Sequence, residues 1–450
     1  MKKAVLSTGL AFIFILLKPL AGEAQLSVSG QLRTRTEFRN GQGAPLPKGT
    51  DAALFTSQRT RLSFGYNAYR LKFNVTAQDV RVWGQDVSTI NRYATQENNG
   101  LMLHEAWGEI LLLDTAIKNK SLNLKIGRQE LLYDDSRLLG NLDWSQQGRR
   151  HDAAVLKYEN KSYMLHVGIA FNQNKENAAT TVYSSTPPAN YAASTNAGYM
   201  YKSMQYLYAG KKLAKGNASF LLFADEFSKY TMAGTAKTYG TGTWNRVTTG
   251  FYYNNSFHKL STTASAYYQF GKNAAGQKVK GELLSGSFMY ADAKKFSAGA
   301  GVDYTSGGSD GTTSRAFDPL YGTPHKFWGL MGYYYAANGF GNKGLIDVYA
   351  KARYKASEKV MLAADYHHFN SACAVYATDN VTNLGKDLGS EIDLVANYTL
   401  TKTIGFEGGY SHYFVTSSLV SPTVKNVANA KAGADWVYVM INIKPEFIFK

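Results

Sequence analysis

The stretch RLKFNVTAQ, Arg70–Gln78, alternates strictly between polar and apolar residues. Neighbouring residues of a β-strand point to opposite faces, so this pattern predicts a strand with one apolar and one polar face. The same period recurs in Leu54–Asn67, Leu345–Lys355 and Glu391–Leu400. The chain is therefore expected to be all-β, with one domain of repeated strands. In the opening stretch, the apolar set is Leu71, Phe73, Val75 and Ala77, and the polar set is Arg70, Lys72, Asn74, Thr76 and Gln78.

The connections between the expected strands alternate between short and long. Short turns on one side and long loops on the other are typical of a transmembrane antiparallel β-barrel, with the short turns periplasmic and the long loops extracellular. Short connections fall near 67–68, 160–161, 214–216, 291–294, 356–358 and 401–403. Long ones span roughly 39–52, 83–101, 133–151, 172–198, 226–243, 306–343, 371–387 and 415–434.

The strand count depends on the segment 305–343. A strand over 325–336 would give nineteen, whereas bacterial single-chain barrels have even strand numbers. Treating 305–343 as one large extracellular loop gives eighteen strands. Eighteen is the prediction, and sixteen is the alternative.

Residues 1–24 read as a secretory signal peptide, and residues 25–450 as the barrel. Lys2 and Lys3 precede a mostly apolar segment, and small residues flank a cleavage point after Ala24. No later run of 18 apolar residues occurs, which excludes a helical inner-membrane protein. The mean hydropathy of −0.29, with 32 Tyr, 23 Phe and 42 Gly, fits a barrel of the Gram-negative outer membrane. The single Cys373 excludes an internal disulfide.

The chain is strongly basic. Its net charge is +16, or +14 without residues 1–24, which hold three lysines and one glutamate. An exported basic protein indicates an anionic partner rather than nucleic acid, and lipopolysaccharide phosphates account for part of the charge. A lipid-facing Arg or Lys would cost about 2–4 kcal/mol at mid-bilayer, so strand cations are expected to face the lumen. The expected basic wall comprises Arg33, Arg35, Arg59, Arg61, Arg70 and Lys72, with Lys125, Lys351 and Arg353 elsewhere.

Acids on the same inward faces leave two interpretations open. They can pair with the arginines and only brace the wall. Alternatively, the unpaired excess lines a constriction, where the planar guanidinium can bind carboxylates bidentately. The inward acids are Glu105, Glu109, Asp347, Asp365, Glu391, Asp393 and Glu407.

Several further stretches carry a resemblance to a known family. The longest is IGRQELLYDDSRLLGNLDWSQQGRRHD (Ile126–Asp152), and the others are GQLRTRTEFR (Gly30–Arg39), RTRLSFGY (Arg59–Tyr66), QDVRVWG (Gln78–Gly84), FDPLYGTPHKFWG (Phe317–Gly329), LGSEIDLVANY (Leu388–Tyr398) and GYSHYF (Gly409–Phe414). Together they resemble the alginate export family of outer-membrane barrels. The resemblance spans most of the chain after residue 24. It implies an eighteen-stranded monomeric barrel with an arginine-rich constriction and loops that occlude the pore at rest.

The resemblance also implies candidate pore-facing cations. By match to the motifs, these are Arg33, Arg35, Arg59, Arg61, Arg81, Arg128, Arg137 and Arg149. Strict alternation from Ile126 would place Arg128 on the lipid side, so a lumenal position there requires a bulge or a place at the rim. Asp134, Asp135 and Asp143 could equally neutralise Arg137, Arg149 and Arg150.

Two glycine motifs match catalytic signatures but lack the surroundings those signatures need. Residues 307–311 fit G-x-S-x-G and residues 339–344 fit G-x-G-x-x-G, yet neither opens a helix after a buried strand. His367 and His368 are adjacent on an expected strand and so face opposite sides. We expect no enzymatic activity, no cofactor and no metal site.

The predicted function is an outer-membrane pore for an anionic, alginate-like polysaccharide or related anions. Its expected partners are an anionic saccharide or small anion, outer-membrane lipid and lipopolysaccharide. The alternative is a general small-solute porin, in which ion pairs cancel the field of the arginines. The loop 305–343 is the predicted plug, because it is long and rich in aromatic residues.

Overall fold

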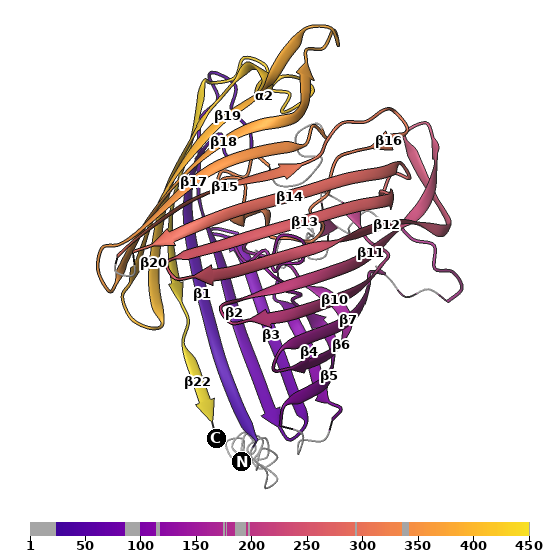
Figure 1. The fold of residues 1–450 in the computed structure, drawn as a ribbon, viewed down its shortest axis with the longest axis vertical. Coiled ribbons are helices and arrows are strands. Elements are labelled where there is room, and N and C mark those ends of the chain that lie inside the picture. The colour runs from indigo at the N-terminus through magenta and orange to yellow at the C-terminus, as the bar shows by residue number, and fades with distance from the viewer. Residues whose placement is uncertain are drawn as a thin grey trace, which may run out of the picture.

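Eighteen antiparallel strands close into a barrel in the computed structural model, as expected (Figure 1). The structure describes residues 24–85, 100–113, 118–173, 176, 178–184, 195–196, 199–292, 295–334 and 342–449. The barrel strands are β1 (Gln25–Asn40), β2 (Ala53–Ala68), β3 (Leu71–Val82), β4 (Met102–Leu111), β5 (Lys120–Gln129), β6 (His151–Asn160), β7 (Tyr163–Phe171), β10 (Ser203–Leu213), β11 (Gly216–Ala233), β12 (Ala236–Phe257), β13 (Leu260–Lys272), β14 (Lys278–Ala291), β15 (Phe296–Thr305), β17 (Leu345–Lys355), β18 (Val360–Tyr376), β19 (Asn383–Thr399), β20 (Ile404–Phe414) and β21 (Gly433–Ile443).

The first strand closes the barrel. One edge of β1 pairs with β2, and its other edge pairs with β21 and with the short strand β22 (Glu446–Phe449). The even strand number brings both ends of the described chain to the same end of the barrel (Figure 1). That end carries the short turns and is therefore the periplasmic one.

The remaining short elements lie in the loops. β8 (Thr195–Asn196) and β9 (Tyr199–Met200) form a small hairpin, and β16 (Thr313–Ser314) pairs with the start of β14. The helices are one turn long: η1 (Pro324–Lys326) and α2 (Ser417–Val420). Within the described ranges, no helix is long and apolar enough to cross a membrane.

The segment 325–336 is not a nineteenth strand where it is described. Residues 325–334 contain part of η1 and turns, and residues 335–336 lie outside the described residues. The signal peptide falls almost wholly on residues 1–23, which also lie outside them, and stays a prediction.

Two expected loops are instead long strands. The segment 226–243 continues β11 and β12 to a turn at 234–235, and 371–387 continues β18 and β19. Beyond the barrel wall, cross-strand pairs such as Tyr230 with Tyr239 and Thr231 with Thr238 extend the hairpin of β11 and β12. Such β-branched and aromatic pairs stabilise a ladder without a lipid-facing apolar side. The search for alternating polar and apolar residues therefore did not predict these strand extensions.

Side-chain alternation separates an apolar outer surface from a polar lumen. On β3, Phe73 is exposed on the outer face, whereas Thr76 and Gln78 are buried on the inner face. On β1, Leu32 faces outward and Arg33 and Arg35 face inward. Arg33 and Arg35 thus avoid the lipid.

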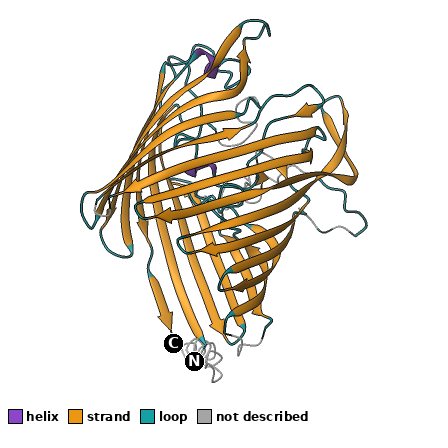
Figure 2. Cartoon of the chain, in the orientation of Figure 1, coloured by secondary structure: helices purple, strands orange, loops and turns teal. Residues whose placement is uncertain are grey.

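Two extracellular loops fold back inside the barrel (Figure 2). We call residues 130–150, between β5 and β6, the inner loop, and the described residues 306–334 and 342–344, between β15 and β17, the plug loop. Leu139 of the inner loop pairs with Tyr321 of the plug loop, and the backbone N–H of Gly140 donates to the Tyr321 carbonyl at 3.0 Å. The Thr323 hydroxyl accepts from the backbone N–H of Leu142. The two loops therefore form one connected unit in the lumen.

Candidate pore constriction

Four arginines on two neighbouring strands form the centre of the site. Arg33 and Arg35 lie on the inner face of β1, and Arg59 and Arg61 lie on the inner face of β2. Arg33 stands directly opposite Arg59 in the strand register. We call these four residues the arginine ladder. Like charges directly across a strand pair repel each other, so the ladder needs acceptors from elsewhere in the molecule.

The inner loop supplies most of these acceptors. Arg33 donates to the Asp143 carbonyl at 2.8 Å and to the Ser145 carbonyl at 3.1 Å. Arg35 donates to the Trp144 carbonyl at 2.8 Å. Three consecutive backbone carbonyls therefore turn toward the ladder, and they satisfy guanidinium N–H groups without neutralising their charge.

Asp143 is the carboxylate that the ladder shares. Its side chain lies 2.8 Å from Arg59, 3.3 Å from Arg33 and 3.6 Å from Arg61. Burial alone would raise the pKa of Asp143, but the three guanidiniums together hold it below its usual value. Asp143 is therefore ionised at neutral pH.

The other acids near the ladder leave an excess of positive charge. Glu37 pairs with both Arg35 and Arg39, and Glu130 lies 3.9 Å from Arg61. Glu130 also pairs with His104 at 2.9 Å. Five arginines, Arg33, Arg35, Arg39, Arg59 and Arg61, thus share the carboxylates of Glu37, Glu130 and Asp143.

Aromatic rings cover the upper part of the ladder. The Arg35 guanidinium lies 4.4 Å from the centre of the Trp144 ring, which stacks on His325 of the plug loop at 4.3 Å. Burial, with the charge of Arg35 beside it, lowers the pKa of His325 to about 3. This imidazole is therefore neutral, and it does not add to the positive charge.

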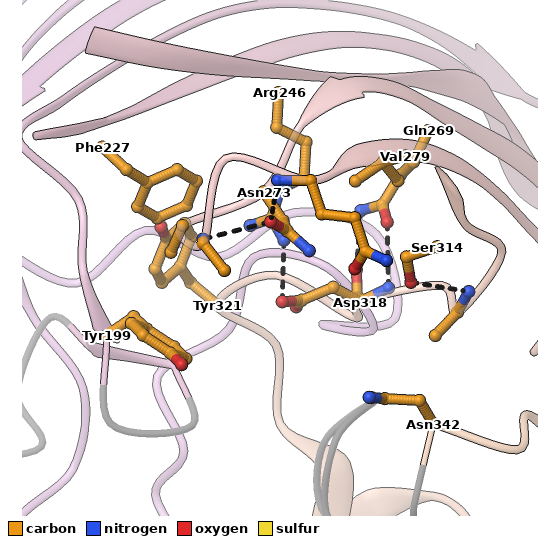
Figure 3. Close-up of a pocket in the computed structure, with 14 residues that line it drawn as sticks. Tyr199, Phe227, Arg246, Gln269, Asn273, Val279, Ser314, Asp318, Tyr321 and Asn342 are labelled. Atoms are coloured by element: carbon orange, nitrogen blue, oxygen red, sulfur yellow. Dashed lines mark hydrogen bonds and ion pairs between the residues drawn. The ribbon is translucent and has the colours of Figure 1, made fainter. Parts of the chain in front are cut away.

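The plug loop is attached to the wall of β11, β12 and β13 (Figure 3). Asp318 accepts from Arg246 at 2.7 Å, and Arg246 also forms a two-bond pair with buried Asp225. The Gln269 side chain donates to the Asp318 carbonyl at 2.7 Å and accepts from its N–H at 2.9 Å. Tyr321 donates to Asp225. A cavity of about 200 Å³ lies beside this contact.

A second attachment joins the plug loop to β19. The backbone N–H of Met331 donates to Glu391 at 2.7 Å, and that of Leu330 donates to Asp393 at 3.3 Å. Gly329, at φ +79°, makes the approach possible, because a Cβ there would lie 2.5 Å from the Glu391 carboxylate. By strand order, β12 and β13 lie across the barrel from β1 and β2. The two loops therefore cross the lumen.

The site residues expected from the sequence lie in different surroundings. Lys72 and Arg353 face the lumen nearer the periplasmic end, where Arg353 forms a two-bond pair with Asp365. Arg137 is buried between Asp135 and Asp303, and Arg149 packs against Tyr321. The arginine ladder lies in the lumen as expected, whereas Arg70, Arg81 and Arg128 differ from the expectation.

Arg81 and Arg128 do not line the lumen, and Arg70 lines only a cavity at its periplasmic mouth, with Lys72 and Glu109. Arg70 lies in the turn between β2 and β3, where it donates to the carbonyls of Leu111 and Leu112. Arg81 lies on the outer face of β3 and pairs with Asp79, because it is an odd number of positions from inward Gln78. Arg128 lies on the outer face with Asp152, which agrees with strict alternation and not with the resemblance.

The inner-loop acids also differ from the sequence expectation. Asp135 does pair with Arg137, but Asp143 contacts the ladder. Asp134 accepts from Tyr208 and Ser219 on the barrel wall. Burial raises the pKa of Asp134 to about 6 against the effect of these hydrogen bonds.

A comparison with protein families shows to which family this chain belongs. Residues 24–426 match the alginate export family. The chain belongs to the alginate export family. No curated protein matches this sequence.

Solved structures of outer-membrane channels share the fold of this family member. OccAB4 of Acinetobacter baumannii is 12% identical, with a TM-score of 0.60 over 96% of this chain and 100% of that one. OpdK of Pseudomonas aeruginosa, solved with vanillate, is 11% identical, with a TM-score of 0.58 over 94% and 99%. OccK9 (OpdG) of Pseudomonas aeruginosa is 14% identical, with a TM-score of 0.58 over 94% and 98%. Family and fold together identify an outer-membrane pore.

Two cavities flank the constriction on its periplasmic side. One, of about 360 Å³, is lined by Arg59, Arg61 and Asp143 together with residues 29–31 of β1 and residues 444–446 after β21. The other, of about 300 Å³, is lined by Trp144, Lys351 and Arg353 among others. The sequence indicated the arginines of these cavities. It did not indicate Arg246 or Gln269, which hold the plug loop, because no spacing signal links them to Asp318.

Proposed function

We propose that this pore passes anionic saccharides, alginate-like polyuronates or related anions by diffusion through the arginine ladder. The observation that carries the proposal is the bonding of Arg33, Arg35 and Arg59 to neutral backbone carbonyls of the inner loop. A solute carboxylate could replace a carbonyl at each guanidinium and form an ion pair in place of a hydrogen bond to a neutral acceptor. The cost of undocking the loop is thereby partly offset.

Several moderate contacts suit a sliding anion better than one tight site. Permeation requires that binding favour entry without preventing exit. The ladder, followed by Lys351 and Arg353 in the neighbouring cavity, would supply such successive contacts. We propose transport as a monomer, without catalysis.

The rival function is a general porin without anion selectivity. It is favoured by the pairing of Arg353 with Asp365 across the wall, and of Arg137 in the inner loop with Asp303 on β15. The two functions differ in the sign and size of ion selectivity.

The test is the zero-current potential of the purified protein in a planar bilayer under a KCl gradient, repeated with added oligo-uronates. We expect chloride preference, and a reduction of current by the uronates. The double variant R59Q/R61Q should bring the potential toward zero, whereas R81Q/R128Q, which removes two outer-face charges, should leave it unchanged. A wild-type potential near zero that ignores uronates would support the general porin.

A further inference from the structure

Three lysines gather on the outer surface of the barrel at the extracellular ends of β13 and β14. We call Lys272, Lys278 and Lys280 the outer lysine cluster; all three are exposed. Lys278 and Lys280 alternate with Val279 and Leu283, which are buried inside the barrel. The cluster therefore points away from the lumen, and it takes no part in the constriction. In Figure 1 it belongs to the strand ends beside β16.

The outer face of this strand pair changes from apolar to basic along the membrane normal. Cross-strand partners on that face alternate in a fixed order, each pair one step nearer the extracellular side: Ala266 with Leu284, Tyr268 with Glu282, Phe270 with Lys280, and Lys272 with Lys278. Tyr268 and Phe270 stack at 6.1 Å. Aromatic rings on the outer surface mark the membrane interface of a barrel. Lys280 thus lies level with Phe270, and Lys272 and Lys278 lie two residues further out, at the height of lipid head groups.

The cluster lacks a protein counter-charge in the part of the chain that the structure describes. No ion pair there joins a carboxylate to Lys272, Lys278 or Lys280, although Glu282 shares their face. By contrast, the outer-face cations Arg81 and Arg128 pair with Asp79 and Asp152. Lys272 and Lys278 stand directly opposite each other, and like charges in that position destabilise a strand pair.

An anion between the lysines would remove this repulsion. Residues two apart on a strand are separated by about 7 Å, and cross-strand neighbours by about 5 Å, so three ammonium groups can reach one phosphate. Each basic residue near an anionic membrane surface contributes to binding, and the contribution falls off within a Debye length. The extracellular leaflet offers such phosphates on a glycolipid whose acyl chains can lie along Phe270, Tyr268 and Leu284.

We propose that the outer lysine cluster binds the phosphate groups of lipopolysaccharide, and that the acyl chains of this lipid pack against the adjacent aromatic surface. The site lies outside the pore and does not depend on what the pore passes. Its failure would leave the proposed transport unaffected.

The test compares lipid binding to the full-length protein by native mass spectrometry. Probes are phosphorylated lipid A, dephosphorylated lipid A and phosphatidylglycerol, with inorganic phosphate as competitor. The variant K272Q/K278Q/K280Q should bind phosphorylated lipid A roughly 10- to 100-fold more weakly than wild type. The control carries the same charge change on exposed periplasmic turns: K161Q/K215Q/K359Q. It should bind like wild type, and both variants should keep the heat-modifiable mobility of a closed barrel.

Three results would overturn the proposal: equal loss in both triple variants, equal wild-type affinity for dephosphorylated lipid A, or equal affinity for phosphatidylglycerol. Displacement by millimolar inorganic phosphate would also count against it, because the site would then bind free anion. If the glutamine variant fails to fold, K272R/K278R/K280R keeps the charge and should retain binding. Loss of binding in that variant would contradict a site based on charge.

Discussion

Asp143 shows how one loop carboxylate can control the arginine ladder. It contacts Arg33, Arg59 and Arg61, yet its side chain is 46% exposed. Its carboxylate joins the inner loop to the wall by bonds between two ionised groups, which are stronger than the arginine bonds to the neutral carbonyls beside it. It is therefore the natural position at which to weaken the loop.

Replacement of Asp143 by asparagine should open the pore. Loss of the charge leaves the arginines without their shared counter-ion. We expect it to weaken docking of the inner loop by about 2 kcal/mol, which lowers the equilibrium constant for docking roughly 30-fold. We expect higher single-channel conductance and stronger chloride preference. The control D51N, in an exposed loop, should behave like wild type. Unchanged conductance in D143N would mean that the carbonyls alone hold the loop.

Asp134 should make barrel stability depend on pH. Burial raises its pKa from 3.8 to about 6. A carboxyl whose folded pKa is raised stabilises the fold fully below its unfolded pKa, and this stability is lost as pH rises through about 6. Relative to D134N, wild type should lose up to about 3 kcal/mol between pH 4 and pH 8. Urea unfolding in detergent at several pH values measures this, and parallel curves for the two proteins would contradict it.

At residue level, the sequence was informative where strand parity could be applied. Parity placed Arg33, Arg59 and Arg61 inward, and it also placed Arg128 outward against the family match. Arg81 was carried over with its motif although its parity relative to Gln78 puts it on the outer face. A motif match carries no information about which face a residue occupies.

We expect the plug loop to limit the flow of ions through the barrel. It contacts the wall through Asp318 on one side and through Leu330 and Met331 on another. Deletion of residues 308–340 should therefore raise single-channel conductance several-fold. Trimming the exposed hairpin tip at 232–237 provides the control and should not change it. Wild-type conductance in the deletion would mean that the inner loop alone limits the current.

At element level, the barrel strands could be read from period-2 alternation, but the position of the loops could not. Alternation reports only that a strand has two unlike faces. Whether residues 130–150 and 306–344 enter the lumen depends on contacts such as Leu139 with Tyr321, which are distant in sequence. The length and aromatic content of the plug loop were the available signal. For the inner loop, its Asp and Arg residues indicated pairing but not the partner strands.

Across the whole molecule, the two loops connect a basic part of the barrel wall with an acidic part. On the β1–β2 side, wall arginines donate to loop carbonyls, and on the β19 side, wall carboxylates accept from loop N–H groups. The loop backbone is thus oriented by the charges of the wall. Breaking the contacts on one side should leave the other side intact, because no described residue takes part in both.

The net positive charge around the ladder should make selectivity depend on salt. Wall charges act over a Debye length, which falls from about 10 Å at 0.1 M to about 3 Å at 1 M. If the excess of arginine over carboxylate sets the selectivity, the chloride-to-potassium permeability ratio should fall toward one over this range. In R59Q/R61Q the permeability ratio should already be low at 0.1 M and should change little with salt concentration, because two of the positive charges that create the field are removed. A wild-type ratio that stays constant from 0.1 to 1 M would show that pore width, and not charge, selects the ion.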